Sequence, residues 1–110
     1  MAVRAFTDDP QRLLRAIRQR LDDGSVTTWS VDGEGDLTHT SRQWARKAWM
    51  RPRVLDDRLL FNIIGSDEEK MTRATYGVYH GRLIQMLMTH FDHLFDEAVA
   101  TAIATRGDAV

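Results

Sequence analysis

The first periodic stretch of the chain follows Pro10. Its apolar residues recur every three or four positions, as one buried helix face requires: Leu13, Leu14, Ile17 and Leu21. Asp8 or Asp9 can cap the first turn, and Pro10 suits a first helical position. Gly24 provides a stop because glycine reaches the left-handed conformation without a Cβ clash. The pattern predicts a helix between residues 10 and 23.

The next region is rich in β-branched and aromatic residues, which favour strands. We expect an antiparallel pair over residues 26–31 and 36–40, joined by the glycine- and acid-rich connection DGEGD. A third strand is expected over residues 49–55, near an edge because Pro52 cannot donate a ladder hydrogen bond. The nearly continuous apolar run RLLFNII, residues 58–64, predicts a central strand.

Residues 43–50 fit two structures. As a helix they would place Trp44 and Trp49 on one stripe, with Thr40 and Gln43 as a capping box. As a strand they would lead directly into the strand that follows. We favour the strand and keep the helix as the alternative.

From about residue 73 to residue 104 the pattern is helical throughout, and Ser66 and Glu69 match a capping box before it. The apolar residues of this segment cover an arc of about 140°, which is wider than a stripe that faces one sheet. They are Leu83, Ile84, Leu87, Met88, Phe91, Leu94, Phe95 and Ala98. Because a small sheet covers only one side of such a helix, we expect the free flank to meet a second copy of the chain, although a different protein is an alternative. The expected dimer interface is Ile84, Met88, Phe91 and Phe95.

These elements predict one α+β domain over residues 1–110, in the order α-β-β-β-β-α. A four-stranded antiparallel β-meander would pack against the long C-terminal helix. The ends, about residues 1–7 and 105–110, are expected to be frayed. A chain of 110 residues is long enough to bury a single core without disulfides, and it contains no cysteine.

Composition and charge indicate where the protein is located and which partners are unfavoured. The first residues hold no apolar signal segment, and no apolar run approaches the ~20 residues of a membrane span. Together with the absence of cysteine, this leads us to expect a cytoplasmic protein. The net charge of −1 makes nucleic acid an unfavoured partner, yet the charge is uneven along the chain. Residues 1–55 contain 10 cations and 7 acids, and residues 56–110 contain 5 cations and 9 acids.

The segment SRQWARKAWMRPR, residues 41–53, combines cations with tryptophans and has no acid. Cations that neutralise phosphates and aromatics that stack on bases are typical of nucleic-acid binding. The residues of this candidate surface are Arg42, Trp44, Arg46, Lys47, Arg51 and Arg53. No known nucleic-acid-binding motif accompanies them, so a solvated face is the preferred interpretation.

The segment TYGVYHGRL contains the most unusual local pattern, two glycines four residues apart within a predicted helix. Gly77 and Gly81 would clear a groove for a close approach of backbone or ligand. The polar groups of a pocket there would be Tyr76, Tyr79, His80 and Arg82, with His80 as an acid or base in principle. The alternative is a core histidine bonded to a backbone carbonyl.

Metal and catalytic chemistry are not expected. His90, His93 and Glu97 lie near one edge of the predicted helix and are weak candidate metal ligands, but a site needs three or four convergent ligands. No catalytic motif is present, so we expect neither an enzyme nor a cofactor. The sequence therefore predicts a small non-catalytic binding or interaction module, homodimeric through its C-terminal helix. Nucleic-acid binding through residues 42–53 and small-molecule binding near His80 are the alternatives.

Overall fold

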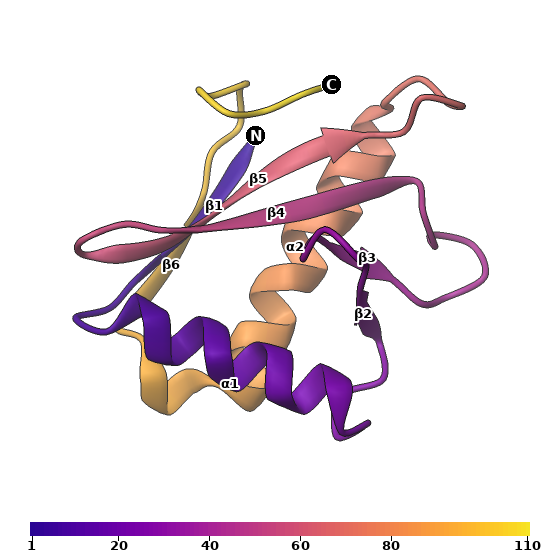
Figure 1. Cartoon of the computed structure of the whole chain (residues 1–110). Helices are drawn as coiled ribbons and strands as arrows, with labels where there is room; N and C mark the ends of the chain where they lie inside the picture. The colour runs from indigo at the N-terminus through magenta and orange to yellow at the C-terminus, as the bar shows by residue number, and fades with distance from the viewer.

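The computed structural model describes all 110 residues and has an α+β architecture, with six antiparallel strands and two helices (Figure 1). The strands are β1 (Ala2–Phe6), β2 (Trp29–Val31), β3 (Leu37–His39), β4 (Ala48–Val54), β5 (Arg58–Gly65) and β6 (Glu97–Ala100). The helices are α1 (Pro10–Asp22) and α2 (Arg73–His90), followed by the short 3-10 helix η1 (Asp92–Leu94). The strand order in the sheet is β2-β3-β4-β5-β1-β6. The predicted α+β class is confirmed, whereas the predicted four-stranded meander has two strands too few.

Both helices pack on the same face of the sheet. Alternate residues of β5, such as Phe61 and Ile63, are fully buried against apolar residues of α1 and α2. Figure 1 shows α1 on one side of the strands and the yellow C-terminal segment beside the N-terminus, on the side away from α1. One face of β4, β5, β1 and β6 is therefore left without a helix. Neither helix is long and apolar enough to cross a membrane.

Helix α1 forms as its sequence predicts. The side chain of Asp9 accepts a hydrogen bond from the backbone N–H of Arg12 at 3.1 Å, and Pro10 opens the first turn. Leu13 and Ile17 are fully buried on the face that meets the sheet. An N-cap carboxylate and a first-turn proline satisfy or remove the donors that a helix leaves free at its start.

The N-terminal residues form β1 and are not frayed. This strand lies between β5 and β6, and Ala2, Val3 and Ala5 have no exposed surface. The segment has only five residues, and its alternation of apolar and polar side chains is too short to distinguish a strand from a terminal tail by sequence. Its central position comes from two pairings that are remote in sequence.

The predicted helix over residues 73–104 is wrong in its second half. Helix α2 ends at His90, and residues 97–100 return as β6 to pair with β1. The helix begins after Thr72, whose side chain accepts a hydrogen bond from the N–H of Thr75, so the predicted capping box before it is not used. The residues EAVA have no strong intrinsic strand preference, and cross-strand pairing overrides their local tendency.

Residues 41–47 form neither the favoured strand nor the alternative helix, because they make a hydrogen-bonded turn before β4. Two side chains from the folded core hold this turn. The Thr38 hydroxyl accepts a hydrogen bond from the N–H of Arg46 at 3.0 Å, and the Tyr79 hydroxyl donates to the carbonyl of Trp44. Arg46 has a left-handed backbone, with φ of 57°. Strand β4 then starts at Ala48, close to the predicted start.

Candidate functional site

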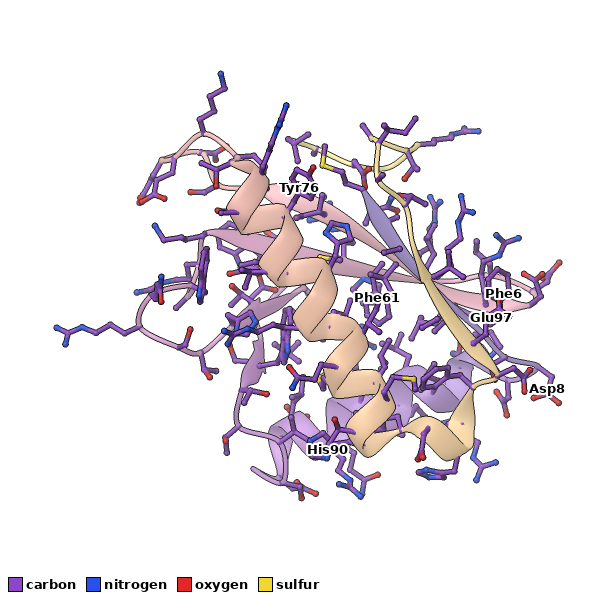
Figure 2. The ribbon with its side chains drawn as sticks, turned by 180° about the vertical axis from the view of Figure 1, so that it is seen from behind. Phe6, Asp8, Phe61, Tyr76, His90 and Glu97 are labelled. Carbon is purple, nitrogen blue, oxygen red and sulfur yellow. The ribbon has the colours of Figure 1, made fainter.

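A cavity of about 180 Å³ lies between the β2–β3 pair and the C-terminal half of α2. Its α2 residues follow helical spacing and therefore share one face of the helix. The lining residues are Thr28, Trp29, His39, Arg82, Gln85, Met86, Thr89 and His90. We call this cavity the His39 pocket. Figure 2 shows His90 at the C-terminal end of α2, whereas Tyr76 lies near the opposite end of the helix.

His39 is the most unusual group of the pocket. It is only 2% exposed, and neither of its ring nitrogens has a hydrogen-bond partner within the chain. Its ring lies 4.3 Å from that of Trp29 and 5.3 Å, edge on, from that of Tyr79. Buried polar atoms in folded proteins are nearly always paired, and an unpaired one often marks a place for a water or a ligand.

The environment of His39 keeps its imidazole uncharged at neutral pH. Burial lowers the pKa of His39 to about 4, and the positive charge of Arg82 acts in the same direction. A neutral imidazole offers one N–H donor and one acceptor nitrogen. The wall of the pocket therefore contains an unused donor–acceptor pair, whose two nitrogens are covered by the neighbouring side chains.

The remaining lining supplies further hydrogen-bond donors. Arg82 is exposed and forms no ion pair, and no carboxylate lines the cavity. Gln85 and the hydroxyls of Thr28 and Thr89 can donate as well. Guanidinium groups match the geometry of carboxylate and phosphate oxygens. The arrangement therefore suits a small anion.

The four residues predicted to form a pocket near His80 do not share one cavity. Tyr79 is fully buried, and its hydroxyl also lies 3.1 Å from that of Thr38. His80 is 5% exposed with Nδ1 against the carbonyl of Tyr76, as the alternative interpretation expected, and its Nε2 has no partner. Tyr76 lines a separate hollow of about 400 Å³ near the start of α2, and Arg82 lines the His39 pocket.

The two glycines of α2 do not create the expected groove. Gly77 and Gly81 are exposed, and a Cβ added to either would have no atom within 4 Å. The close approach that these glycines suggested is therefore absent from the folded chain.

The basic segment is divided between two places. Arg51 and Arg53 lie on β4, whereas the other four residues lie in the turn before it. In that turn, Trp44 packs partly against the core, and Lys47 pairs with Glu69 at 2.9 Å. Arg42 and Arg46 are exposed.

The predicted dimer residues are largely used within the chain. Phe91 is 1% exposed in the core, and Ile84 and Phe95 pack against that core while half-buried. Met88 alone is open, at 55% exposure. The wide apolar arc was predicted on the assumption that the helix continues past His90. Because the helix ends there, most of the arc residues beyond it instead pack in or against the core. The homodimer stays a prediction.

The weak metal candidates lie on different elements. His90 ends α2, His93 lies in η1 and Glu97 begins β6, so the helical spacing that related them is lost. The structure contains no group of three or more histidine or acidic side chains placed to hold a metal ion.

Comparisons with protein-family models, with curated proteins and with solved structures find no match for this chain. The sequence contains part of the signal for the His39 pocket, because Arg82, Gln85, Met86, Thr89 and His90 share a helix face. The position of His39 opposite that face depends on the fold.

Proposed function

We propose that this chain is a non-catalytic binding protein for a small anion, a carboxylate or a phosphate, held in the His39 pocket. The observation that supports this most directly is the buried imidazole of His39, with two unpaired ring nitrogens beside a cavity. Leaving a buried polar group unpaired costs about 1–3 kcal/mol. A ligand that pairs with His39 would recover part of that cost on binding.

The chemistry of the lining supports an anion. Arg82 has no acidic partner, and the donors of Gln85 and Thr89 lie on the same helix face. The cavity is smaller than the ~300 Å³ at which sites for drug-sized ligands begin, so the ligand is small. We propose binding without catalysis because no second group contacts the ring nitrogens of His39 to orient it for proton transfer.

Binding is expected to be linked to protonation. An anion beside His39 counters the positive charge of Arg82, which helps to keep the imidazole neutral. The pKa of His39 therefore rises in the complex, and binding near pH 5 takes up protons. The affinity for an anion should increase as the pH falls from 7 toward 5.

Isothermal titration calorimetry with inorganic phosphate and with acetate tests the proposal, using the unmodified chain and His39→Phe. We expect one of these anions to bind the unmodified chain, with proton uptake measured in buffers of different ionisation enthalpy. His39→Phe should lose at least about tenfold in affinity, because both ring nitrogens are gone.

His80→Phe is the matched control, since His80 is also buried but does not line the cavity. It should bind the same anion within about twofold of the unmodified chain if it remains folded by circular dichroism. Equal loss of affinity in both variants, or no binding of either anion, would overturn the proposal.

A further inference from the structure

The sheet face opposite the helices carries a concentration of arginines. Successive side chains of a strand point to opposite faces, and Val3, Ala5, Leu59, Phe61 and Ile63 point into the core. Their neighbours therefore point to the helix-free face. The arginines among these outward positions are Arg4 on β1, Arg51 and Arg53 on β4, and Arg58 on β5.

Strand register arranges these side chains in rows across β4, β5 and β1. In one row, Arg53 faces Leu60, which in turn faces Arg4. Adjacent strands lie about 4.8 Å apart, so these two arginines are separated by roughly 10 Å at the backbone. Leu60 is only 8% exposed although no helix covers it. The flanking side chains therefore screen it from water, as long arginine stems can.

Aromatic side chains mark the two ends of this face. At one end Arg58 faces Phe6, and its guanidinium lies 5.3 Å from the centre of the Phe6 ring. At the other end Trp49 faces Ile64, and Trp49 is half-buried. The two ends are three rows apart, which is about 20 Å along the strands.

The outward strand positions of this face carry mainly cations, and acids of the neighbouring loops border them. Glu34 and Asp36 pair with Arg51, and Asp67 and Glu68 line a hollow with Trp49. Glu97 is the one acid at an outward strand position of β1, β4, β5 or β6. Arg51 is bonded to Asp36 at 2.8 Å, and Arg58 is bonded to Asp57 at 2.8 Å. Arg4 and Arg53 form no ion pair. Two guanidinium groups are thus free for an anionic partner, and two more lie beside them.

The C-terminal segment covers part of the face and leaves the β4 side open. Asn62, in the row of Arg51, is 4% exposed because its amide donates to the carbonyl of Arg106 and to Asp108. The side chain of Arg106 is exposed and adds a further cation near this row. The open path follows β4 from Arg53 to Trp49.

We propose that this helix-free face binds single-stranded nucleic acid along β4. Proteins that bind single strands pair cations with phosphates and stack bases on aromatic rings, and this face has both kinds of group, with the arginines lying between Phe6 at one end and Trp49 at the other. Guanidinium groups are suited to phosphate because of their planar donor geometry. Because the net charge of −1 gives no overall attraction to nucleic acid, binding would depend on Arg4 and Arg53, the two arginines of the face that form no ion pair.

Fluorescence anisotropy with a fluorescein-labelled oligothymidylate tests the proposal. The unmodified chain should bind it at low salt and lose affinity as salt increases. For two to four phosphate contacts, the slope of log affinity against log salt should lie between about −1.4 and −2.8. Arg4→Gln combined with Arg53→Gln should weaken binding by at least about tenfold and reduce the slope by about 1.4.

The matched control is Arg12→Gln combined with Arg15→Gln, which removes the same charge from the exposed side of α1. It should keep affinity within about threefold of the unmodified chain. Arg4→Lys combined with Arg53→Lys keeps the charge and should retain most of the salt slope. His39→Phe, on the other face, should bind oligothymidylate normally, so this proposal and the proposed function fail independently.

Three results would overturn the proposal. The first is an absence of oligothymidylate binding at low salt, and the second is an equal effect of the Arg4/Arg53 and Arg12/Arg15 pairs. The third is binding to phosphatidylserine vesicles or polyglutamate at concentrations where oligothymidylate does not bind, which would assign the face to a different partner.

Discussion

His39 is the residue at which stability and binding oppose each other. Its ring packs against those of Trp29 and Tyr79, and an apolar aromatic side chain could make the same ring contacts. Its two ring nitrogens add a desolvation cost without an internal partner. Residues that lower the stability of a fold in this way are often needed for function.

Replacement of His39 by phenylalanine is therefore expected to stabilise the ligand-free chain at pH 7, by about 1–3 kcal/mol. The aromatic contacts remain, and the unpaired nitrogens are removed. Urea denaturation of both proteins measures the change. Because phenylalanine is larger, His39→Leu serves as a second variant, and a loss of stability in both would show that His39 stabilises the fold.

The same residue sets a pH dependence of stability. Burial, with Arg82, lowers the pKa of folded His39 to about 4, below its ordinary value of 6.5, so the unfolded chain binds more protons between these values. The contribution of neutral His39 is complete above pH 6.5 and is lost as the pH falls toward 4. The difference in unfolding free energy between the unmodified chain and His39→Phe should grow over this window, by at most about 1.4 kcal/mol per pH unit. A constant difference would contradict this assignment.

At the scale of elements, α2 contains two glycines that lower its stability and that no close packing contact requires. Gly77 and Gly81 lie within the helix, point to solvent and contact nothing that a methyl group would disturb. Glycine in a helix interior costs stability because its backbone is freer in the unfolded chain. The helix is therefore less stable than its length allows.

Gly81→Ala is expected to raise the free energy of unfolding by about 0.5–1 kcal/mol, as measured by urea denaturation. Gly107→Ala is the contrasting variant. Gly107 has φ of 100°, and a Cβ there would lie 2.6 Å from the side-chain oxygen of Asn62. That change should destabilise the chain, and a destabilised Gly81→Ala would mean that the exposed glycine has a role that its surroundings do not show.

At the scale of the whole molecule, Asp108 connects the C-terminal segment to the middle of the sheet. Its carboxylate accepts hydrogen bonds from the amide of Asn62 at 2.8 Å and from the N–H of Thr105 at 2.7 Å. It also accepts from the N–H of Ile63 and pairs with the amino group of Met1. Residues 105–110, expected to be frayed, are thus held against β5.

The pKa of Asp108 is lowered, because burial, which raises it, is outweighed by these hydrogen bonds and by the amino group of Met1. Its stabilising effect is therefore complete above its ordinary pKa of 3.8 and is lost as the pH falls below that value. Asp108→Ala should lose about 1.5–3 kcal/mol of unfolding free energy at pH 7. Exposed Asp92→Ala is the control, and similar effects of the two changes in urea denaturation would refute this role.

Local signals predicted the elements that depend on local interactions. Asp9, Pro10 and the apolar stripe predict helix α1, because the capping residues and the amphipathic spacing all lie within one short segment. The run RLLFNII predicted a buried central strand, and it became β5, with neighbours on both sides. The β4 strand also lies close to its predicted bounds.

Tertiary structure decided the features that depend on distant partners. Strands β1 and β6 lie next to each other although about 90 residues separate them, and neither has a strong strand signal of its own. Their pairing ends the apolar helix pattern at His90, because cross-strand hydrogen bonds satisfy a backbone that could locally have continued as helix. The same folding brings His39 to the α2 face. Propensity and periodicity act over a few neighbours, whereas these contacts form only when the whole sheet closes.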